Sequence, residues 1–148
     1  MDEYRGCELP EELYYDLDYL WARPHEDGTY VLGLTDPAQT MAGRVVAVTF
    51  RKVGTHRKAG RHVATLESGK WVGGVPLPFD GTIERVNPVL SDNPGLVNIS
   101  PYTDAWLLVA RPDDPQQAVR HLKKGPEAIA ALKAWIDRYD IDCMRCTE

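Results

Sequence analysis

The sequence lacks any long apolar run, so we expect no transmembrane helix and no membrane insertion. Residues 1–7 are acidic and contain no hydrophobic stretch of the kind that a secretory signal requires, so we expect a cytoplasmic protein. An excess of positive charge is also missing, because 17 Lys and Arg face 22 Asp and Glu, a formal net charge of -5. This balance argues against nucleic acid or an anionic membrane surface as the main partner.

Cysteine is scarce and is confined to the two ends of the chain, at Cys7, Cys143 and Cys146. An odd number in a cytoplasmic protein argues against a structural disulfide framework. Cys143 and Cys146 have Cys-x-x-Cys spacing, but a second pair or nearby histidines for zinc are lacking, as is the setting of a thioredoxin-like site. We therefore expect a mobile tail with two ordinary thiols. A redox role, or a disulfide from Cys7 to a tail cysteine, is the open alternative.

The motifs of a self-contained enzyme are missing as well. We find no Gly-x-Ser-x-Gly elbow, no Gly-x-x-x-x-Gly-Lys-Ser/Thr phosphate loop and no Gly-x-Gly-x-x-Gly fingerprint. The four histidines show no spacing typical of metal ligands. The sequence therefore predicts no catalytic residue and no metal site, and it indicates that the chain is not an enzyme.

Short apolar segments separated by Gly, Pro, Asn and Asp are what the chain does contain. They predict a mainly β protein, a sandwich or flattened barrel with C-terminal helices. The segments with the strongest strand patterns are residues 20–23, 29–34, 44–50, 81–86 and 106–110. Residues 91–95 are a run of turn-forming residues, so we expect a turn there.

Three segments predict helices. Residues 35–43 combine a capping residue, a proline at the first helical position and a final glycine. Residues 116–124 predict a short helix, and residues 127–139 repeat apolar side chains at three- and four-residue spacing, which predicts a helix packed on the β core. The expected organisation is an N-terminal extension, a β domain, C-terminal helices and a cysteine-containing tail. These parts are residues 1–18, 19–112, 113–140 and 141–148.

Residues 62–81 predict a β-hairpin with Lys70 in its exposed turn. The simplest interpretation of Lys70 is a solvated loop lysine. An accessible amine on a rigid turn is also what a carrier protein needs for acylation. The neighbouring Trp71 either offers an apolar resting surface to an attached arm or packs into the body of the hairpin.

The sequence Glu67-Ser68-Gly69-Lys70, followed in register by Pro78 and Gly81, resembles the lipoyl-lysine hairpin of the glycine cleavage system H protein. Further matches extend from about residue 19 to residue 112 and include Trp21, Gly28–Thr35, Asn93–Asn98 and Trp106. The resemblance implies the lipoyl, or hammerhead, β-sandwich with two pseudo-symmetric halves. It also implies that lipoic acid is attached to Lys70 by an amide bond, and that Glu67 and Gly81 help to place the hairpin for the ligase.

The residues after Lys70 differ from that family's pattern, because Trp71-Val72-Gly73-Gly74 replaces small residues and a Ser-Asp pair. Together with Cys7–Pro10 and the cysteine-ended tail, they resemble the lipoate-binding proteins of the sulfur-oxidising heterodisulfide-reductase-like pathway. This resemblance implies a swinging-arm carrier of sulfur intermediates in cytoplasmic sulfur oxidation to sulfite. The implied partners are a lipoate ligase or lipoyl-assembly enzymes, a heterodisulfide-reductase-like complex and a dihydrolipoamide dehydrogenase-like protein.

Two other functions stay open at this point. The first is a glycine cleavage H protein that carries an aminomethyl group on the same lipoyl-lysine. The second is an unmodified binding scaffold with the same fold.

Overall fold

The structure is a computed structural model that describes residues 2–16 and 19–144. Its largest element is a seven-stranded sheet in the order β12-β3-β4-β5-β11-β10-β7, in which every neighbouring pair is antiparallel. In chain order its strands are β3 (Tyr14–Tyr15), β4 (Leu20–Pro24), β5 (Tyr30–Leu34), β7 (His56–Arg57), β10 (Gly81–Val86), β11 (Leu108–Pro112) and β12 (Lys123–Lys124).

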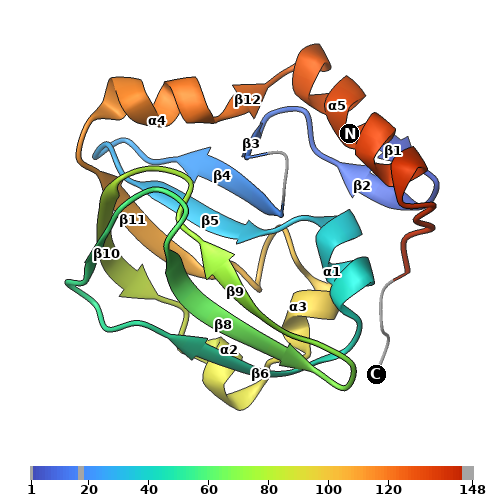
Figure 1. The fold of residues 1–148 in the computed structure, drawn as a ribbon, viewed down its shortest axis with the longest axis horizontal. Helices are drawn as coiled ribbons and strands as arrows, with labels where there is room; N and C mark the ends of the chain where they lie inside the picture. The colour runs from blue at the N-terminus through green and yellow to red at the C-terminus, as the bar shows by residue number, and fades with distance from the viewer. Residues whose placement is uncertain (1, 17–18, 145–148) are drawn as a thin grey trace.

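A second sheet has three strands in the order β6-β8-β9 and covers one face of the larger sheet (Figure 1). These strands are β6 (Val45–Phe50), β8 (His62–Ser68) and β9 (Val72–Pro76). Within the described residues the two sheets do not close into one barrel, and the architecture is a flattened sandwich. The prediction of a mainly β fold with C-terminal helices is confirmed.

Strand β5 shows how the sequence makes this arrangement stable. All five of its residues are buried, because the strand has packed layers on both faces. Tyr30, Leu32 and Leu34 belong to the core between the two sheets, whereas Val31 belongs to a second core on the outer face. This alternation follows from the two-residue period of a strand.

Five helices are described: α1 (Asp36–Ala42), α2 (Val89–Asp92), α3 (Leu96–Ile99), α4 (Pro115–His121) and α5 (Pro126–Arg138). The predicted helices at 35–43 and 127–139 are confirmed. The predicted helix at 116–124 ends earlier, since Lys123 and Lys124 pair with β3 as strand β12. The expected turn at 91–95 overlaps the end of one single-turn helix, α2, and leads into another, α3, and the sequence pattern did not reveal either helix. In the described part of the chain, none of the helices is both long and apolar enough to cross a lipid bilayer.

The N-terminal hairpin and the segment from α5 to Cys143 meet in the second core. Helix α5 packs its buried side chains, Ala128, Ile129, Leu132 and Ile136, against residues of the N-terminal segment and the outer sheet face. The N-terminal segment forms a hairpin of β1 (Asp2–Tyr4) and β2 (Cys7–Leu9). Beside this hairpin, the backbone amide of Cys143 donates a hydrogen bond of 3.0 Å to the carbonyl of Arg5.

Cys7 and Cys143 form a disulfide, with their Cα atoms 4.8 Å apart. The expectation of a mobile tail with ordinary thiols is therefore wrong for Cys143. The physical reason is the path of α5, which returns the chain to the β1–β2 hairpin. Arg5 also forms ion pairs there with Asp140 and Asp142. Cys146 lies outside the described residues.

Candidate functional site

Lys70 lies at the tip of the β8–β9 hairpin. The backbone amide of Ser68 donates a 2.8 Å hydrogen bond to the carbonyl of Trp71, which leaves Gly69 and Lys70 as a two-residue loop. Both loop residues are exposed, and a Cβ atom at Gly69 would meet nothing within 4 Å. The hairpin therefore holds Lys70 outward on a paired backbone.

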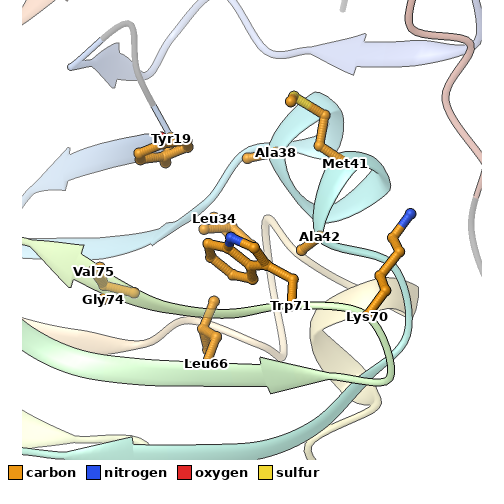
Figure 2. Close-up of a pocket in the computed structure, with 10 residues that line it drawn as sticks. All are labelled: Tyr19, Leu34, Ala38, Met41, Ala42, Leu66, Lys70, Trp71, Gly74 and Val75. Atoms are coloured by element: carbon orange, nitrogen blue, oxygen red, sulfur yellow. The ribbon is translucent and has the colours of Figure 1, made fainter.

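The Lys70 side chain extends along the end of α1 (Figure 2). It crosses Gly43, where an added Cβ would lie 2.8 Å from Lys70 Cε and 3.5 Å from Nζ. Gly43 has a φ of 79°, which glycine adopts without strain. The ion pairs within residues 2–16 and 19–144 do not include Lys70. Its amine is therefore accessible and is not held by a carboxylate.

A cavity of about 280 Å³ lies between the hairpin and α1, directly beside Lys70 (Figure 2). Its walls are mainly apolar and come from β5, α1, β8 and β9, with contributions from Leu34, Ala38, Met41, Leu66 and Val75. Among the described lining residues Lys70 alone is charged. Such a cavity suits an apolar group attached to the lysine amine.

Trp71 also lines this cavity. Figure 2 shows its indole extending from the hairpin toward Leu34. The ring lies against Gly73, where a Cβ atom would overlap it. The residue remains 41% exposed. The structure thus combines parts of both interpretations, since the indole packs on the hairpin and still presents a face to the cavity.

A buried polar network holds α1 and the following loop in place. Asn98 donates to the carbonyl of Gly43 at 2.8 Å and to the side-chain oxygen of Gln39 at 3.0 Å, and it accepts from the Val45 amide at 2.8 Å. Asp36, at the start of α1, accepts from the backbone amide of Glu8 at 2.9 Å. Because Asn98 and Asp36 are each 1% exposed, losing these bonds would leave buried groups unpaired. The residue pattern did not single out this network.

The other site residues expected from the sequence lie in different places. Glu67 is exposed on β8 and pairs with Val72, so it flanks the lysine turn. Gly81 begins β10 in the other sheet, where it pairs with Pro112 of β11 and Arg57 of β7. It does not line the cavity next to Lys70. A Cβ at Gly81 would lie 2.5 Å from the carbonyl oxygen of Arg111, so the sheet itself requires glycine there.

Replacing Gly81 with alanine is therefore expected to destabilise the protein by about 2 kcal/mol, because the added methyl meets backbone that cannot move aside. Gly69→Ala is the matched control, since its methyl would enter open space. Urea denaturation measures both unfolding free energies. Equal stability of the two variants would contradict the close approach of β10 and β11.

The disulfide is connected to the cavity wall through the tail. The side-chain amide of Gln39, on α1, donates a 2.8 Å hydrogen bond to the carbonyl of Met144, the residue after Cys143. Cys7 is completely buried. The disulfide therefore anchors the described part of the tail, up to Met144, beside α1 and the N-terminal hairpin, and it does not line the cavity.

Comparison with known proteins identifies a family. Residues 13–134 match the family model described as glycine cleavage H-protein. Glycine cleavage system H protein 3 of Aquifex aeolicus (strain VF5) is 47% identical over 97% of this chain and 92% of its own length. Glycine cleavage system H protein 5 of the same organism is 43% identical over 97% of this chain and 99% of its own length. The glycine cleavage system H protein of Enterobacter sp. (strain 638) is 42% identical over 72% of this chain and 82% of its own length.

A solved structure gives the same result. The crystal structure of a glycine cleavage system H protein from Mycobacterium marinum aligns with a TM-score of 0.72 and 25% sequence identity. The alignment covers 90% of this chain and 100% of that chain. Fold, family match and full-length relatives agree, and the chain belongs to the glycine cleavage H-protein family, whose members are lipoate carriers rather than catalysts.

Proposed function

We propose that this chain is a lipoyl carrier with lipoic acid joined to Lys70 by an amide bond. The observation that carries the proposal is the position of Lys70, exposed on a two-residue loop that a backbone hydrogen bond closes, and adjacent to an apolar cavity. Acylation removes the charge of the amine, so the modified side chain can lie against apolar walls without burying a cation. When attached, lipoamide supplies a disulfide that can be reduced and loaded with a group.

The protein's own residues present and shelter this arm. The β8–β9 pairing holds Lys70 away from the core, where a lipoate ligase or lipoyl-assembly enzyme reaches it. Glu67 is exposed on the approach to the turn and is the flanking side chain such an enzyme contacts. Trp71, Met41 and Ala38 provide apolar surface on which the arm rests between transfers, out of contact with water.

The cargo that the comparisons favour is the aminomethyl group of glycine cleavage. The family model and the reported relatives all bear that name, and the relatives match across most of the chain. On this proposal the partners are glycine decarboxylase and a dihydrolipoamide dehydrogenase-like protein. The chain accepts the group from one partner and presents the arm to the next.

A sulfur intermediate is the second candidate cargo, and one observation favours it. Trp71 places a large indole directly beside Lys70, where the H-protein pattern has a small residue. On this alternative, the partner is a heterodisulfide-reductase-like complex.

Reconstitution with purified glycine decarboxylase tests the cargo. The lipoylated chain is expected to support exchange of labelled bicarbonate with the glycine carboxyl group. The unlipoylated chain, prepared without ligase, is expected to give only background exchange, because the amine alone cannot accept the aminomethyl group. Background exchange from chain that mass spectrometry shows to be lipoylated would reject the glycine assignment in favour of sulfur.

A further inference from the structure

A second hollow, of about 200 Å³, lies away from the lysine turn and is lined by Arg51, Arg57, Gly60, Arg61 and His62. Its cations come from three parts of the chain. Arg51 follows β6, Arg57 ends β7, and Arg61 directly precedes His62, the first residue of β8. His62 and Lys70 are at opposite ends of the hairpin, roughly 25 Å apart at the rise of an extended strand. The hollow is therefore separate from the attachment point of the arm.

Among the residues that the structure describes, the three arginines of the hollow have no acidic ion-pair partner. The ion pairs that the described residues form involve Arg5, His56 and Arg111, and do not include the three arginines of this hollow. Arg57 Nε is buried and has no hydrogen-bond partner within the described structure. A covered guanidinium nitrogen without an acceptor is costly, and a nearby negative charge would offset that cost.

Neighbouring carboxylates are already used by other groups. Asp113 pairs with His56 at 2.6 Å. Asp80 accepts from the backbone amide of Ala59 at 2.7 Å, and mainly for this reason the pKa of Asp80 lies below its ordinary value. Lys58 and His56 also lower that pKa, so Asp80 already interacts with groups outside the hollow. None of the ion pairs among the described residues compensates the three arginines, although the whole chain carries a net charge of -5.

Three backbone amides beside the hollow already donate to carbonyl groups of the chain. Gly60 N–H donates to Leu77 at 2.8 Å, Leu77 N–H donates to Arg61 at 2.9 Å, and Arg61 N–H donates to Lys58 at 3.0 Å. A small free oxyanion is commonly held by unpaired backbone amides, and these are not available. Recognition therefore depends on guanidinium side chains spread over the surface, which bind several carboxylates at once.

We propose that this arginine hollow docks an acidic segment of a partner protein, whose Asp and Glu carboxylates pair with Arg51, Arg57 and Arg61. Arginine is enriched at protein interfaces, and a local patch of opposite sign speeds encounter with such a partner. Docking at this end of the hairpin holds the carrier while Lys70 remains free at the other end. The hollow binds its partner whether or not Lys70 is modified.

The test uses the full-length, isotope-labelled chain and a capped hexaglutamate peptide at low ionic strength, followed by nuclear magnetic resonance. Backbone amide shifts are expected to concentrate at residues 51 and 57–62 and to weaken as salt is added. The triple variant Arg51→Gln/Arg57→Gln/Arg61→Gln is expected to bind the peptide about tenfold more weakly. The control, Lys124→Gln/Lys133→Gln/Arg138→Gln, makes the same charge change on β12 and α5 and is expected to bind within roughly twofold of the parent.

Three results would overturn the proposal. An equal loss in both triple variants would show a net-charge effect without a site. Sulfate or phosphate that shifts the same amides at equal affinity would assign the hollow to a small anion. A single-stranded oligonucleotide that binds there more tightly than the peptide would assign it to nucleic acid. If the first triple variant does not fold, the double variant Arg51→Gln/Arg61→Gln, at two exposed positions, decides the question.

The Lys70→Arg chain separates this inference from the carrier function. It is expected to bind the peptide as the parent does. A chain that is lipoylated normally but does not bind the peptide would reject only the docking proposal.

Discussion

Replacing Lys70 with arginine is expected to abolish lipoylation completely. Arginine keeps the charge and much of the reach of the side chain, but its delocalised guanidinium is never deprotonated and is not acylated as an amine is. Intact-mass measurement after co-expression with a lipoate ligase should show full modification of the parent and none of the variant. The variant should fold normally, with an unfolding free energy within about 0.5 kcal/mol of the parent, because Lys70 is exposed.

Lys52→Arg is the matched control, since Lys52 is also an exposed loop lysine but is distant from the hairpin tip. Its modification should equal that of the parent. A mass shift that persists in Lys70→Arg would show attachment to another lysine and would remove the basis of the carrier proposal. A parent that is never modified by any ligase, in its native cell included, would favour the unmodified binding scaffold.

Removing the disulfide is expected to lower the stability of the oxidised protein by about 4 to 5 kcal/mol. Cys7 and Cys143 are 136 residues apart, so their bond closes nearly the whole chain and restricts the unfolded ensemble strongly. We expect Cys7→Ala and Cys143→Ala to give equal losses, measured by urea denaturation without reductant. Reductant should lower the unfolding free energy of the parent to that of the variants and leave both variants unchanged. The Tm of the parent should fall by roughly 10 °C or more on reduction.

Cys146→Ala is the control for this experiment and should leave the stability of the oxidised protein within about 0.5 kcal/mol. Cys146 is the remaining cysteine of the chain. If Cys146→Ala destabilises the protein and Cys143→Ala does not, the N-terminal cysteine pairs with the other tail thiol. If neither does, the two ends are held by packing and the Arg5 ion pairs alone.

Features that depend on neighbours in the chain were predictable. Ser68 to Trp71 contains the small residues that a tight turn needs, so the exposure of Lys70 follows from local geometry. Helix α1 has Thr35 as its cap and Pro37 in its first turn, and α5 has a clear apolar face. Helices α2 and α3 were missed because each is a single turn within a proline- and asparagine-rich stretch, whose composition favours turns.

Features that depend on distant contacts were not predictable. Residues 51–62 are visibly basic, but only the pairing of β7 with β10 and of β6 with β8 makes three of their arginines line one hollow. Gly81 was implied by the resemblance to help place the hairpin for the ligase, and only the tertiary structure shows that it also admits the β11 backbone. The partner of Cys7 depended on where α5 ends, which no local pattern records.

The sequence by itself therefore determined the β class, the lysine turn and the chemistry of its amine, since these follow from local conformation and residue type. Only the tertiary structure placed α1 against the hairpin to form the apolar cavity, joined the chain ends and gathered the arginines. Those arrangements depend on packing between segments far apart in the sequence, and the free energy that selects them comes from buried surface that a linear pattern does not contain.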